Sequence, residues 1–121
     1  MLTRQIIAGL FSIIVIMAPG YVYAHASLHH SEPAAGAIVE SSPEAIRLWF
    51  SKPIEPSFSK VKVIDQTGQQ VDKNNASVSG DEAKLLEISI PVLPAGTYKV
   101  IWSIVALDGH KAKGDFTFTI K

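Results

Sequence analysis

From residue 28 onward the chain is a succession of short segments in which apolar and polar residues alternate, each closed by turn residues. Alternation with a period of two is typical of β-strands that bury one face, because successive side chains point to opposite sides. The segments are rich in β-branched and aromatic residues, and no helical period extends over ten residues. They cover residues 28–31, 46–51, 58–65, 85–90, 97–105 and 114–120. The pattern predicts an all-β fold, a Greek-key β-sandwich or barrel of about seven strands in the immunoglobulin-like size range.

Two further features follow from this pattern. The polar stretch at residues 72–82, which contains Asn74, Asn75 and Gly80, is predicted to be a loop. Large aromatic side chains ordinarily bury their area, so those in the alternating segments are expected in the core or beside it. They are Trp49, Phe50, Trp102, Phe116 and Phe118.

The first 24 residues have a different character. Arg4 is followed by an apolar run at residues 6–18, then by Pro19-Gly20, with small residues at Val22 and Ala24. This arrangement predicts a secretory signal peptide, residues 1–24, cleaved after Ala24. The alternative is an uncleaved anchor, but the run is shorter than the roughly 20 apolar residues of a membrane span. The expected product is an exported domain, residues 25–121, with no membrane span.

Charge and sulfur content exclude several classes of function. Eleven basic and eleven acidic residues balance, which argues against a nucleic-acid partner. The chain has no cysteine, so it forms no disulfide, thiolate zinc site, iron–sulfur cluster or cysteine nucleophile. Both methionines, Met1 and Met17, lie in the predicted signal peptide. The exported domain therefore lacks the soft sulfur ligands that Cu(I) prefers.

Histidine and aspartate supply the candidate metal ligands. Cleavage after Ala24 makes His25 the first residue, and its free amine and imidazole Nδ1 together chelate one ion. The reference pKa of such an amine is only about 7.7–8.0, so a metal ion can displace its proton near neutral pH. Asp108-Gly109-His110 lies before the last strand segment, and in extended backbone Asp108 and His110 point to one side. Three nitrogens and one oxygen suit Cu(II). The alternative is that Asp108-Gly109 simply forms a turn.

These residues resemble the CopC family of periplasmic copper-binding proteins, and within it the small YobA-like members. The resemblance rests on residues 25–36 (HASLHHSEPAAG), 48–51 (LWFS) and 108–118 (DGHKAKGDFTF), and it spans the whole exported domain. It implies a β-sandwich of cupredoxin-like topology that binds Cu(II) through His25, Asp108 and His110. It also implies a periplasmic role in copper homeostasis, resistance or delivery, alongside a CopD-like inner-membrane copper transporter.

The sequence departs from the family pattern in two places. Some relatives have a methionine-rich loop that forms a Cu(I) site, but residues 72–82 contain no methionine. Some have a carboxylate just after the Phe-Ser strand end, where this chain has Lys52. We therefore expect no second copper site, no ligand at position 52, and a solvated surface charge on Lys52. The alternative is that Lys52 hydrogen-bonds to a copper-bound carboxylate or water.

The remaining histidines leave alternatives open. His29 shares a strand face with His25 and is a candidate spare ligand, although four residues of extended chain span roughly 13 Å. His30 is expected to be exposed. Cleavage after Ala26 would instead expose Ser27-Leu28-His29, an amino-terminal motif that binds Cu(II) through four nitrogens and leaves Asp108 and His110 unused.

Catalysis is not expected. A histidine that binds copper through its amine also occurs in the histidine brace of copper-dependent oxidative enzymes, which keep positions open for oxygen. A carboxylate from Asp108 would fill one of those positions and favour a carrier. A third hypothesis is an inert exported domain whose histidines are incidental.

Overall fold

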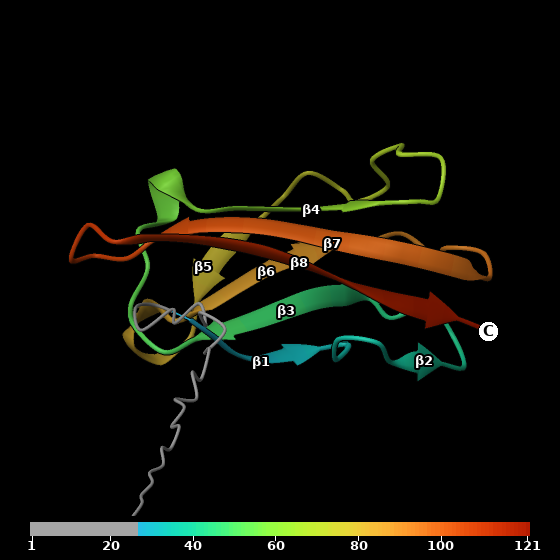
Figure 1. Ribbon diagram of the computed structural model, residues 1–121, viewed down its shortest axis with the longest axis horizontal. Helices are drawn as coiled ribbons and strands as arrows, with labels where there is room; N and C mark the ends of the chain where they lie inside the picture. The colour runs from blue at the N-terminus through green and yellow to red at the C-terminus, as the bar shows by residue number, and fades with distance from the viewer. Residues whose placement is uncertain (1–26) are drawn as a thin grey trace, which may run out of the picture.

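The computed structural model describes residues 27–121 as two four-stranded sheets packed face to face (Figure 1). One sheet has the order β1-β3-β6-β5 and the other the order β2-β8-β7-β4. The strands are β1 (Leu28–Glu32), β2 (Ile38–Val39), β3 (Ala45–Phe50), β4 (Lys60–Ile64), β5 (Ser77–Ser79), β6 (Leu85–Ser89), β7 (Gly96–Val105) and β8 (Lys111–Ile120), with short 3₁₀ turns η1 (Pro56–Phe58) and η2 (Asp81–Ala83). The predicted all-β sandwich is confirmed.

The strand pairing is antiparallel except between β2 and β8. Two of the eight strands, β2 and β5, lie outside the alternating segments because they contain only two and three residues. The prediction that residues 72–82 are all loop is wrong for β5, where Val78 pairs with Leu86 of β6. A three-residue strand is too short to show alternation, so only the partner strand reveals it.

The core lies between the sheets and is built from the inward-facing residues of the long strands. Ile46 and Leu48 of β3 and Val100 of β7 are completely buried, and Phe118 of β8 is 1% exposed. The ring of Phe118 stacks on that of Tyr98, with centroids 5.8 Å apart. Phe50, Trp102 and Phe116 are also buried, as predicted, whereas Trp49 is half-buried.

One end of the sandwich brings distant parts of the chain together. After β3, residues 53–55 bind the turn between β7 and β8: Glu55 N–H donates to Val105 O at 2.7 Å, and Leu107 N–H donates to Pro53 O at 3.0 Å. Ser51, just before this segment, binds the start of β1. The start of β1 and the β7–β8 turn therefore both lie near the end of β3. Within residues 27–121, no helix has the length and apolarity needed to cross a membrane.

Candidate metal centre

The turn between β7 and β8 holds Asp108 and His110. Ala106 N–H donates to His110 O at 2.8 Å, and Gly109 N–H donates to Ala106 O at 2.8 Å. Gly109 has φ +92°, a left-handed conformation that residues with a Cβ rarely adopt. A turn, rather than extended backbone, therefore brings the carboxylate and the imidazole together.

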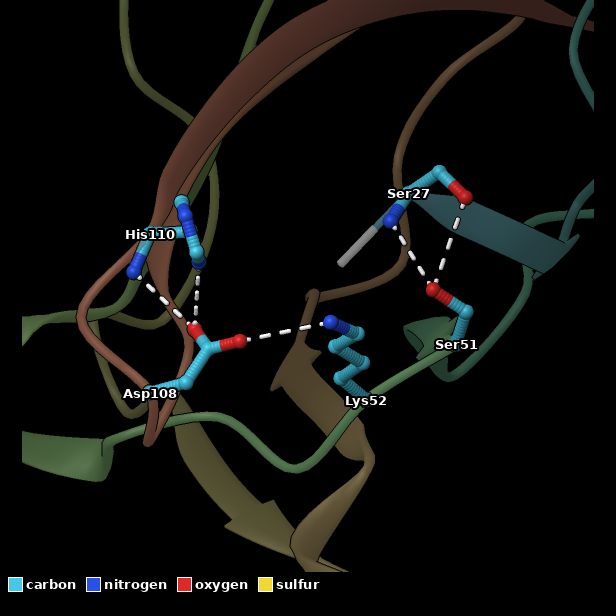
Figure 2. A network of polar contacts seen from close by, with 5 residues as sticks. All are labelled: Ser27, Ser51, Lys52, Asp108 and His110. Carbon is cyan, nitrogen blue, oxygen red and sulfur yellow. Dashed lines mark hydrogen bonds and ion pairs between the residues drawn. The ribbon is translucent and has the colours of Figure 1, made fainter. Parts of the chain in front are cut away.

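Asp108 and His110 contact each other directly (Figure 2). Oδ1 of Asp108 accepts a hydrogen bond from His110 N–H at 3.0 Å and lies 3.0 Å from Nδ1 of the His110 ring. About half of each side chain is exposed. The turn thus presents an oxygen and an imidazole side by side at the surface, where an ion from solvent can reach both.

The electrostatic environment keeps Asp108 ionised. The hydrogen bond from the His110 backbone lowers the pKa of Asp108 most, followed by the hydrogen bond with the His110 ring. A hydrogen bond from the Lys52 side chain lowers it further. Together they hold the pKa of this carboxyl well below its ordinary value. Asp108 is consequently a charged oxygen donor over the whole neutral and mildly acidic range.

Lys52 is not the isolated surface charge that the sequence suggested. Its Nζ donates to Oδ2 of Asp108 at 3.3 Å, on the opposite side of the carboxylate from His110 (Figure 2). The hydrogen bond to the carboxylate is the alternative named for Lys52, and it forms because residues 53–55 bind the β7–β8 turn and place position 52 beside position 108. The two residues are 56 positions apart, so no local sequence pattern shows their contact.

The described chain starts next to this cluster. Ser27 N–H donates to Oγ of Ser51 at 3.0 Å, and Ser51 N–H donates back to Ser27 O at 3.0 Å. Ser51 immediately precedes Lys52, and Figure 2 shows Ser27, Ser51, Lys52 and Asp108 in one network. His25, the third predicted ligand, lies outside the described residues, two positions before Ser27.

Two of the three predicted ligands are therefore described. Residues 27–121 contain no group of three or more metal-ligating side chains, so the described part of the chain has a pair rather than a complete set. His29 and His30 are both exposed. The His30 ring packs on Trp49, with centroids 4.9 Å apart, and its Nε2 lies 3.5 Å from Oε2 of Glu32.

Sequence comparison identifies relatives along the whole described domain. Residues 28–121 match the family model of the CopC domain. Protein YobA from Escherichia coli K12 is 40% identical over 101 residues, which cover 83% of this chain and 82% of that protein.

Two solved structures have the same fold. CopC from Methylosinus trichosporium OB3b superposes with a TM-score of 0.72 at 29% identity, covering 80% of this chain and 94% of the other. PcoC, described as a methionine-rich copper resistance protein from Escherichia coli, superposes with a TM-score of 0.68 at 36% identity, covering 80% and 99%. With the family model matched from β1 to the last residue, the chain belongs to the CopC family.

Proposed function

We propose that this protein is an exported copper-binding protein that holds one Cu(II) ion for copper homeostasis, resistance or delivery in the periplasm. Residues 1–24 are the signal peptide and residues 25–121 the copper-binding domain. The ligands are His25, through its amine and imidazole, and the side chains of Asp108 and His110. Its relative PcoC is described as a copper resistance protein, which supports a copper-related role.

One observation carries this proposal: hydrogen bonds hold Ser27, the first described residue, close to the Asp108–His110 pair. Ser27 is hydrogen-bonded to Ser51, and Lys52 contacts Asp108. Two residues of extended chain span at most about 7 Å, so a first residue at position 25 stays close to this network. The contacts of Ser27 with Ser51 and of Lys52 with Asp108 thus support a site in which the start of the exported domain meets the β7–β8 turn.

The donor chemistry favours Cu(II) as cargo. Imidazole and amine nitrogens with a carboxylate oxygen match the tetragonal sets typical of Cu(II), and no sulfur ligand is available after cleavage to favour Cu(I). The ionised carboxylate of Asp108 offsets part of the positive charge of the ion. A carboxylate bound in this way also fills a position that an oxidative enzyme leaves open, which supports a carrier. The family resemblance implies a CopD-like membrane transporter as its partner.

Copper titration of the exported protein tests the proposal. We expect one Cu(II) per chain, with His110→Ala weakening the affinity by at least about 100-fold; even outer partners of metal ligands contribute 10–100-fold. His30→Ala is the matched control, because His30 packs on Trp49 and pairs with Glu32, and it should bind like the wild type. Weak, non-stoichiometric binding that His110→Ala leaves unchanged would instead indicate an inert exported domain.

Acidification should release the ion. Protons compete with the metal for the amine, whose reference pKa is about 7.7–8.0, and for both imidazoles. The pKa of Asp108 is held below its ordinary value, so the carboxylate stays charged while the nitrogens take up protons. Between pH 7.5 and pH 5.5 the affinity should fall by about 100-fold or more. A chelator competition assay at each pH measures this fall. An affinity that stays the same across that range would contradict nitrogen ligation.

Replacing Lys52 should strengthen copper binding. The ammonium of Lys52 competes with the ion for Oδ2 of Asp108 and adds a positive charge beside the site. Lys52→Met removes both effects, and we expect the Cu(II) affinity to rise by about fivefold, the upper range for an exposed ion pair. Lys52→Arg keeps the charge and serves as the control in the same titration. If Lys52→Met binds more weakly, the lysine positions the carboxylate instead of competing for it.

A further inference from the structure

Five lysines lie on the outer face of the sheet formed by β4, β7 and β8. The alternation of these strands turns their apolar residues into the core and leaves the lysines exposed. Strand register places Lys60 and Lys113 on either side of Ser103, and Lys111 opposite Val105. The five residues, here called the lysine face, are Lys60, Lys62, Lys99, Lys111 and Lys113.

The lysine face differs from the rest of residues 27–121, where four of the five other basic residues form ion pairs. Arg47, Lys52, Lys84 and Lys121 each lie within 4 Å of a carboxylate, on Glu87, Asp108, Glu82 and Glu40 respectively. Within residues 27–121, none of the five lysines of the face has such an ion pair, and no acidic residue lies directly opposite one of them in the strand register. The nearest in register is Asp115, which lies opposite Ile101. Five of the eleven basic residues of a neutral chain are thus gathered on one side without partners.

We propose that the lysine face binds the surface of an anionic phospholipid membrane. Protein interfaces are enriched in arginine and depleted in lysine, because the guanidinium forms directional paired hydrogen bonds. All five residues here are lysines, whose compact charges suit a diffuse layer of phosphates that needs no fixed geometry. Clusters of four to eight basic residues are typical of attraction to anionic lipids.

An exposed aromatic side chain adds an apolar contact beside these charges. Phe58 of η1 is 64% exposed, lies two residues before Lys60, and lines a shallow hollow with Val105 and Lys113. Phenylalanine side chains are among those that enter the boundary between headgroups and acyl chains. Lys111 directly follows His110, so a protein bound through this face holds the β7–β8 turn near the membrane surface.

Vesicle binding of the metal-free exported protein tests this proposal, so its outcome does not depend on copper. We expect binding to vesicles of phosphatidylcholine mixed with phosphatidylglycerol at low ionic strength, loss of binding at high salt, and none to phosphatidylcholine alone. Each lysine near an anionic surface strengthens binding by about fivefold, so Lys60→Gln with Lys113→Gln should weaken it about 25-fold.

The matched control removes two lysines elsewhere. Lys84→Gln with Lys121→Gln causes the same change in net charge, but both residues pair with glutamates away from the face. We expect this variant to bind vesicles like the wild type. Equal weakening in both double variants would overturn the proposal, because net charge alone would then explain binding. Failure of the wild type to bind phosphatidylglycerol vesicles would also overturn it, and binding to polyglutamate in that case would assign the face to an acidic protein.

Discussion

One glycine added before His25 is expected to weaken Cu(II) binding by at least about 100-fold. The addition turns the chelating amine of His25 into an amide and moves the free amine one residue away, so the paired nitrogen donors are lost. Loss of an outer partner of a metal ligand already costs 10–100-fold, and here a ligand itself is removed. Competition with a chromogenic chelator measures the change in affinity.

The matched control adds the same glycine after Lys121, at the other terminus. This chain keeps the length and charge of the test variant and should bind Cu(II) like the wild type. Unchanged affinity in the variant extended before His25 would show that the first amine is not a ligand. Asp108 and His110 would then need another partner.

Phe118→Ala is expected to lower the free energy of unfolding by about 3–5 kcal/mol, the range for removing a buried phenylalanine. The side chain is 1% exposed and stacks on Tyr98 in the centre of the sandwich. Small domains have a total stability of about 5–15 kcal/mol, so this single change removes a large fraction of it. Urea denaturation of the metal-free protein measures the loss.

Thr117→Ala is the control for this experiment. Thr117 neighbours Phe118 on β8 but faces solvent, and surface substitutions usually change stability by less than about 0.5 kcal/mol. A loss below about 1 kcal/mol in Phe118→Ala would contradict the packing of β8 as the centre of the core.

The long strands were predictable from sequence because they bury one face. In β7, Val100, Trp102 and Ile104 are buried while Lys99 and Ser103 are exposed, so burial and alternation carry the same information. The strands β2 and β5 were not predictable, because a segment of two or three residues has no period. Their pairing is set by β8 and β6, which the sequence does not place beside them.

The candidate site was partly predictable for a similar reason. Asp108 and His110 are neighbours in sequence, so their proximity needs only a local turn, which Gly109 permits. The contact of Lys52 with Asp108 depends on how the two sheets meet, and that of Ser27 with Ser51 on the pairing of β1 with β3. No local pattern encodes such contacts. The family resemblance pointed to position 52 as a neighbour of the site, and the folded structure shows the hydrogen bond that Lys52 forms there.

The electron paramagnetic resonance spectrum of the exported protein loaded with one Cu(II) tests the central proposal most directly, because nitrogen hyperfine splitting reports the number of nitrogen ligands. Ligation by the amine and imidazole of His25, the imidazole of His110 and the carboxylate of Asp108 predicts three nitrogens and one oxygen. A spectrum with four nitrogens, unchanged in His110→Ala, would contradict it and indicate binding through Ser27-Leu28-His29 at a chain that starts two residues later.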